Sequence, residues 1–82
     1  MATPLTLMGI MVDHRSQVAP GVQEVITRYG GDILCRLGVP SPSKERGLIT
    51  LVLETDHNTV HSFKKELETI SGIEVQTMIF PQ

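Results

Sequence analysis

The chain has 82 residues, a net charge of −2 and a single cysteine. This length is enough for one domain, which we place over residues 1–82. The seven lysines and arginines are scattered, which argues against direct binding of nucleic acid because phosphates require a basic face. One cysteine excludes an internal disulfide and fits a reducing compartment. The sequence shows neither a signal peptide nor an apolar stretch long enough to span a bilayer, so we expect a cytoplasmic protein that does not contact membranes.

The first half of the chain reads as strand, helix and strand. Apolar residues occupy both parities of Leu5 to Val12, which is typical of a strand covered on both faces. A helical stripe follows over Val18 to Tyr29. Its start has two alternatives: Ser16 is the N-cap, or Pro20 is the first helical residue after a longer loop. The pair Gly30-Gly31 ends the helix.

The second half repeats this pattern after a turn-rich stretch, Pro40 to Gly47. Asp56 or Asn58 is suited to cap the second helix. The predicted elements after the first helix are strand Ile33 to Val39, strand Leu48 to Leu53, helix Val60 to Ile70 and strand Ile73 to Phe80.

This order predicts an α+β fold, a ferredoxin-like βαββαβ plait. It has a four-stranded antiparallel sheet with two helices on one face. We place the first and third strands side by side in the centre and expect this central pair to be parallel. Both central strands are apolar on both faces, so the second face of the sheet should also be covered. In so short a chain a second copy would have to cover it, which predicts a homo-oligomer that associates through sheet faces or edges.

Four residues are candidates for binding a ligand. Asp13, His14 and Arg15 follow the first strand beside a helix N-terminus, where free N–H groups favour an anion; the alternative is a solvated loop. Arg36 has the parity opposite to the apolar series of its strand. It either pairs with a carboxylate across an oligomer interface or projects into water. Cys35 belongs to the apolar series, so we expect a buried thiol.

Three histidines raise the alternative of a metal site. His57 and His61 are spaced for one helix face. Parallel central strands would end at one edge of the sheet, which would bring His14 close to them. Ordinary exposed loop and helix-end histidines are the simpler explanation, so we assign no metal, and the sequence does not identify a cofactor. The sequence has no nucleophile elbow, and Gly30-Gly31 follows a helix rather than a strand, which does not suit a phosphate loop. We expect a protein that is not an enzyme.

Several stretches together resemble a known family. They are Met8 to Arg15, Val25 to Ile33, Cys35 to Pro40, Gly47 to Glu54 and Ile70 to Thr77. Over nearly the whole chain these resemble the small stand-alone regulators associated with iron-only hydrogenase systems. The most specific part is the Arg-x-Gly-x-Pro motif that begins at Arg36.

The resemblance implies a fold similar to ACT regulatory domains and to the C-terminal domain of the nickel-responsive repressor. Asp13, Pro20-Gly21 and Gly30 to Ile33 follow the ACT pattern with a longer loop and with Asp32 in place of asparagine. The nickel site does not carry over, since no histidine lies on a predicted strand. The resemblance implies an oligomeric regulatory or ligand-sensing module that acts through a small molecule or a partner protein. The alternatives are a small metal-binding protein that uses His14, His57 and His61, or a structural assembly subunit without a ligand.

Overall fold

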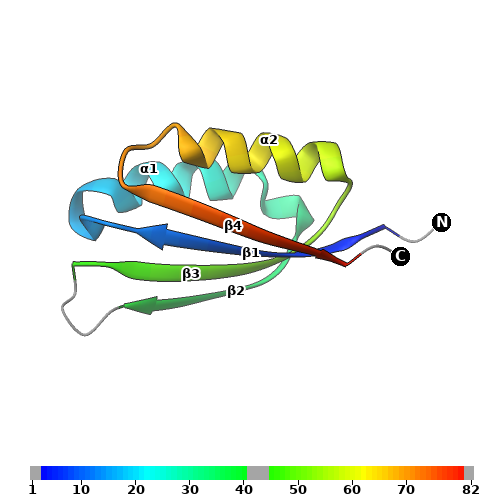
Figure 1. Ribbon diagram of the computed structural model, residues 1–82, viewed down its shortest axis with the longest axis horizontal. Helices are drawn as coiled ribbons and strands as arrows, with labels where there is room; N and C mark the ends of the chain where they lie inside the picture. The colour runs from blue at the N-terminus through cyan, green and yellow to red at the C-terminus, as the bar shows by residue number, and fades with distance from the viewer. Residues whose placement is uncertain (1–2, 41–44, 81–82) are drawn as a thin grey trace.

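The predicted alternation of strands and helices is present in the computed structural model, which describes residues 3–40 and 45–80. The turn predicted between the second and third strands includes residues 41–44, which lie outside these ranges. Figure 1 shows the elements. In chain order they are β1 (Leu5–Val12), α1 (Arg15–Arg28), a short 3-10 helix η1 (Gly30–Asp32), β2 (Ile33–Pro40), β3 (Gly47–Glu54), α2 (His57–Glu68) and β4 (Ile73–Phe80).

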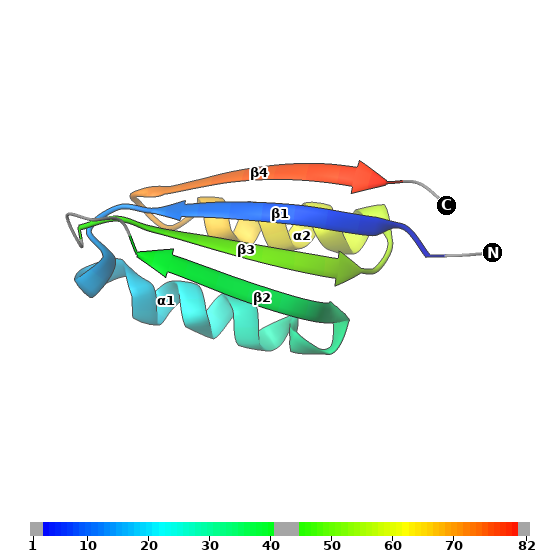
Figure 2. The ribbon, with the colours of Figure 1, turned by 90° about the horizontal axis from the view of Figure 1, so that it is seen from below.

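The four strands form one antiparallel sheet in the order β2-β3-β1-β4. Both helices cover the same face, with α1 on the β2 side and α2 nearer β4 (Figures 1 and 2). The ferredoxin-like plait is therefore confirmed, but the parallel central pair is wrong. Leu5 of β1 lies opposite Glu54 of β3, and Val12 lies opposite Gly47. The crossover through α1 returns β2 in the direction of β1, and the β2–β3 hairpin then reverses the chain.

The hydrophobic core lies between the sheet and the two helices. Alternate residues of β1 point toward the helices, and Met8 and Ile10 are completely buried. The period of two along the strands and of 3.6 along the helices brings these side chains together. The other buried apolar side chains are Val12, Val22, Val25, Ile26, Leu51, Leu53, Val60, Phe63, Leu67 and Val75.

Helix α1 begins at Arg15, so both predicted starts are wrong. The residue before it, His14, takes a left-handed conformation with φ of 50° and ψ of 51°. Its backbone carbonyl accepts hydrogen bonds from the N–H groups of Gln17 and Val18, at 2.9 and 3.1 Å. The helix therefore starts on a backbone turn without a side-chain cap, a geometry that the sequence does not reveal. Pro20 lies inside the helix.

Of the two predicted N-cap candidates of helix α2, the structure uses Asp56. The Asp56 carboxylate accepts a hydrogen bond from the backbone N–H of Thr59 at 2.7 Å. This bond satisfies one of the N–H groups that a helix leaves without a partner at its start. It also lowers the pKa of Asp56 below its ordinary value.

We expect Asp56→Ala to lower the melting temperature by several degrees, because the first turn of α2 loses its acceptor. Circular dichroism melts at neutral pH would measure the change. Asp56→Asn is the matched control, since its side-chain oxygen still accepts the bond, and it should melt close to wild type. Equal melting of the alanine variant and wild type would show that the cap contributes nothing.

Neither α1 nor α2 is long and apolar enough to cross a membrane; this holds for the part of the chain that the structure describes.

Candidate functional site

Figure 2 shows the sheet face turned away from the helices, which we call the open sheet face. Large apolar side chains make up much of this face. Ladder partners share a face, so the pairs of Leu7 with Val52 and of Leu7 with Met78 place one apolar row across its middle. Six large apolar residues of this face are 40–62% exposed. They are Leu7, Leu37, Val39, Leu48, Met78 and Phe80. The predicted apolar character of both faces of the central strands is thus confirmed.

A β-bulge in β2 changes which of its side chains share a face. Ile33 is the ladder partner of Leu53, whereas Cys35 is the partner of Val52, and the register shifts between them. The extra residue, Leu34, reverses the parity. Cys35 therefore lies on the open sheet face and is exposed, and the expectation of a buried thiol is wrong. The sequence pattern predicts that Ile33, Cys35, Leu37 and Val39 share one apolar face. Ile33 does not share a face with Cys35, so this prediction is wrong for Ile33.

Arg36 lies on the helix side of the sheet, beside α1. Its ladder partner is Leu51, a core residue, and its Nη2 donates a hydrogen bond to Oε1 of Gln23 in α1 at 2.8 Å. Arg36 is exposed but held near the helix. The prediction that Arg36 and Cys35 lie on opposite faces of the strand is confirmed. The residue that Arg36 contacts is Gln23 of the same chain, rather than a carboxylate of another copy.

A cavity of about 610 Å³ lies between α1 and the β2–β3 edge of the sheet. It exists because the facing positions carry small side chains. Gly38 and Gly47 line it from the sheet, and Ala19 lines it from α1. A Cβ atom built on Gly38 would meet no described residue within 4 Å, so none of the described side chains fills this space. Among the described residues that line it, Arg36 alone carries a formal charge.

The loop between β1 and α1 does not line this cavity, although Val12 just before it does. Asp13 is exposed and its Oδ1 lies 3.2 Å from Nε of Arg46. Its backbone N–H donates to the carbonyl of Gly72 at 2.9 Å, which ties the loop to the start of β4. His14 is exposed. Of Arg15, only the backbone is described. The structure thus brings Arg36 to the cavity and leaves Asp13 and His14 outside its lining.

The histidines do not gather at one edge. Because β1 and β3 are antiparallel, the end of β1 that precedes His14 lies beside the start of β3 at Gly47. His57 follows the end of β3, at the opposite edge of the sheet. This separation follows from the antiparallel central pair and overturns the predicted neighbourhood of three histidines. His57 and His61 remain one turn apart on α2, and both are exposed. Across residues 3–40 and 45–80, no three histidine, cysteine or acidic side chains are grouped to hold a metal ion.

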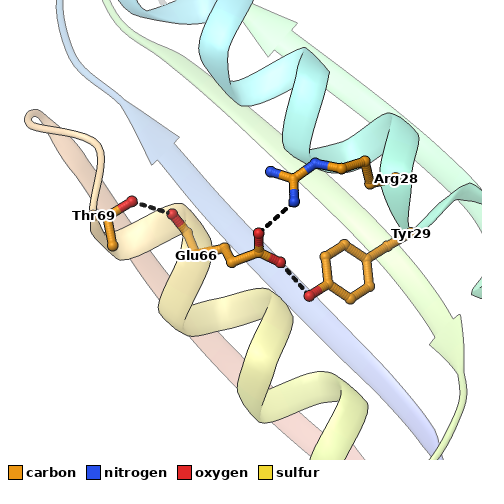
Figure 3. Close-up of polar contacts among 4 residues, drawn as sticks. All are labelled: Arg28, Tyr29, Glu66 and Thr69. Atoms are coloured by element: carbon orange, nitrogen blue, oxygen red, sulfur yellow. Dashed lines mark hydrogen bonds and ion pairs between the residues drawn. The ribbon is translucent and has the colours of Figure 1, made fainter.

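A polar cluster joins the two helices at the C-terminal end of α1 (Figure 3). The Tyr29 hydroxyl donates to one carboxylate oxygen of Glu66, and Nη1 of Arg28 donates to the other. The tyrosine bond is the main cause that lowers the pKa of Glu66 and raises the pKa of Tyr29. The Tyr29 ring also stacks on Phe63, with centroids 4.3 Å apart. The hydrogen bonds and the ring contact of this cluster connect the C-terminal end of α1 to α2.

The cluster predicts that stability falls in acid. Because the pKa of Glu66 is lower in the folded chain, its contribution is complete above the ordinary glutamate pKa and disappears as the pH falls through the folded value. Urea midpoints of wild type and Glu66→Gln should therefore differ at neutral pH and converge on acidification. A difference that persists unchanged in acid would contradict the role of the Glu66 charge.

Comparison with known proteins fits this architecture. Residues 4–77 match the model of the TM1266-like family, described as "Iron-only hydrogenase system regulator, putative". The chain belongs to this family. The solved structure of the uncharacterized protein TM1266 from Thermotoga maritima is similar, with 31% identity and a TM-score of 0.88 over 94% of this chain and 96% of that one. No curated protein matches the chain.

Other solved structures share the fold alone. An unknown protein from Galdieria sulphuraria has a TM-score of 0.70 at 7% identity, over 98% of this chain and 46% of that one. A formyltetrahydrofolate deformylase from Pseudomonas putida KT2440 has a TM-score of 0.63 at 7% identity, over 94% of this chain and 29% of that one. These neighbours have the ferredoxin-like and ACT-like arrangement.

Proposed function

We propose that this chain is a homo-oligomeric, ligand-sensing regulatory module of an iron-only hydrogenase system. It acts through a small molecule or a partner protein, without catalysing a reaction and without contacting DNA itself. The observation that carries the proposal is the open sheet face, where six large apolar side chains are exposed. Monomeric proteins rarely expose a contiguous apolar patch of more than a few hundred Å² unless it serves as a contact surface.

The layout of the open sheet face suits a second copy of the same chain. Its two acidic residues lie at opposite ends, since Glu54 pairs with Leu5 and Glu74 pairs with Met11. Two copies related by a twofold axis can therefore bury the apolar middle while Glu54 and Glu74 of each copy stay in water at the rim. Such an arrangement avoids the large penalty for burying an unpaired charge.

A hollow of about 230 Å³ in this face adds to the complementarity. It lies over Gly9, whose missing side chain leaves the middle of β1 uncovered. Met11 and Leu48 border it, as do the polar Glu74 and Gln76. An apolar side chain from a second copy would pack over Gly9 against Met11 and Leu48, with Glu74 on the outer side of the hollow, which supports an interlocking contact rather than a flat one.

The regulatory role is tested in a host that has an iron-only hydrogenase. Deleting the gene should change hydrogenase activity and transcript level, and wild-type protein should restore both. Leu7→Glu, which places a charge in the middle of the open sheet face, should fail to restore them. Ser62→Glu adds the same charge on the exposed surface of α2 and should restore them as wild type does. Unchanged hydrogenase activity and transcript level after deletion would overturn the regulatory role.

A further inference from the structure

We propose that the cavity between α1 and β2 binds an amphipathic monocarboxylate, with its carboxylate on Arg36 and its apolar part inside the cavity. The proposal rests on the function proposed above and names the class of ligand that the module senses. No residue of the polar loop after β1 is needed for it. The chemistry of the lining, rather than its position, identifies the ligand.

The interior of the cavity suits an apolar group. Val12, Ala19 and Ile49 contribute aliphatic side chains, and Gly38 contributes only backbone on the same side. A volume of about 610 Å³ lies within the range of small-molecule sites, roughly 300–1,000 Å³. Removing an apolar group from water into this space is the driving force for binding.

The polar end of the cavity suits a carboxylate. The Arg36 guanidinium is planar and has several N–H donors, of which the structure uses one for Oε1 of Gln23 at 2.8 Å. The remaining donors can bind both oxygens of a carboxylate in the forked geometry typical of arginine. Gln23 also lines the cavity, accepts a hydrogen bond from the guanidinium and has amide N–H groups of its own. The two side chains together form a donor pair at one end of an apolar space.

The same lining argues against two other classes of ligand. The described lining residues include no carboxylate, so the ammonium group of a free amino acid would lose water without gaining a partner. The nearby Asp13 is already paired with Arg46. A nucleotide carries several charged phosphate oxygens, whereas Arg36 is the one cationic side chain among the described residues that line this cavity. A monocarboxylate matches both the single charge and the apolar walls.

The first test compares three ligands that differ only in their polar group: phenylacetate, phenylacetamide and phenylalanine. Isothermal titration calorimetry of wild-type protein should detect phenylacetate and find the amide and the amino acid at least about tenfold weaker. Hexanoate, an acid of different shape, serves as a second probe. Absence of binding by both acids, or equal binding of the amide or the amino acid, would overturn the proposal.

Two variants place the binding in this cavity. Arg36→Gln should weaken phenylacetate by about tenfold or more, whereas Lys65→Gln removes one charge from the exposed surface of α2 and should change nothing. Gly38→Val should abolish binding because its side chain enters the cavity, and open space around the Cβ allows the fold to persist. Undiminished binding to folded Gly38→Val or Arg36→Gln would overturn the proposal.

The outcomes separate this inference from the proposed function. If the acids do not bind while the protein still associates and still affects the hydrogenase, the ligand class is wrong and the regulatory module stands. If phenylacetate binds in the Arg36-dependent way while gene deletion leaves the hydrogenase unchanged, the site stands and the regulatory role is wrong.

Discussion

Phe63→Ala is expected to lower the melting temperature of the chain by more than about ten degrees. The Phe63 side chain is 1% exposed and packs under Tyr29, with an angle of 9° between the two rings. Truncating a buried phenylalanine costs about 3–5 kcal/mol through lost burial and the cavity that remains. Stability of roughly 0.05–0.15 kcal/mol per residue leaves a domain of this size little margin. The variant also removes the ring that positions Tyr29 against Glu66.

Far-UV circular dichroism and urea unfolding would measure this effect. Phe63→Leu is the matched control, because leucine keeps most of the apolar volume and should unfold at a midpoint near wild type. A Phe63→Ala protein that melts within a few degrees of wild type would show that the core tolerates the loss. In that case the packing between α1 and α2 would not limit the stability of the fold.

Leu7→Glu is expected to abolish self-association while the single chain stays folded. Leu7 is 42% exposed, so the substitution leaves the monomer core intact. In a twofold assembly through the open sheet face, both copies would bury a carboxylate beside Val52 and Met78 without a partner. The penalty corresponds to a weakening of self-association on the order of a hundredfold or more. Ser62→Glu should associate as wild type does.

Cys35 provides a direct readout of this association. Its thiol lies on the open sheet face and is exposed in the single chain. If two copies cover this face, maleimide labelling of wild type should slow as the protein concentration rises. Labelling of Leu7→Glu should stay fast at every concentration. Association of Leu7→Glu with wild-type affinity, or labelling of wild type that ignores concentration, would exclude the open sheet face as the contact.

Strand β2 connects the two surfaces on which the proposals rest. Its residues alternate, so Arg36 and Gly38 lie on the helix side of the sheet while Leu37 and Val39 lie on the open sheet face. Arg36, Gly38 and Val39 all line the cavity. A ligand that holds Arg36 therefore acts on the strand whose other side contributes to association. This alternation gives a sensing site and a contact surface a shared structural element.

The order of elements was predictable because periods of two and 3.6 are local properties of the sequence. The direction of β3 relative to β1 depends on tracing the chain through the crossover and the hairpin. Because the two strands were predicted to be parallel, the three histidines were wrongly expected at one edge of the sheet. The bulge after Ile33 reversed the exposure of Cys35, and no residue type in that strand marks it. No sequence pattern marks the left-handed conformation of His14 either.

The cavity could not be found from sequence, because it depends on a distant pairing of small residues. Gly38 in β2 and Ala19 in α1 are unremarkable alone and leave space only where the fold sets them opposite each other. Arg36 was a candidate from its parity, which the structure confirms relative to Cys35. Its partner Gln23 lies on α1. The alternation along β2 could therefore identify Arg36 as a candidate but could not predict which side chains surround it.

Native mass spectrometry of the wild-type protein, purified without added metal or ligand, tests most directly whether this chain associates with itself. We predict an oligomer at micromolar concentration that dissociates in the Leu7→Glu variant. A small molecule with the mass of a monocarboxylate, retained by wild type and lost in Gly38→Val, would identify the occupant of the cavity. A wild-type protein that stays monomeric at all concentrations would contradict self-association through the open sheet face.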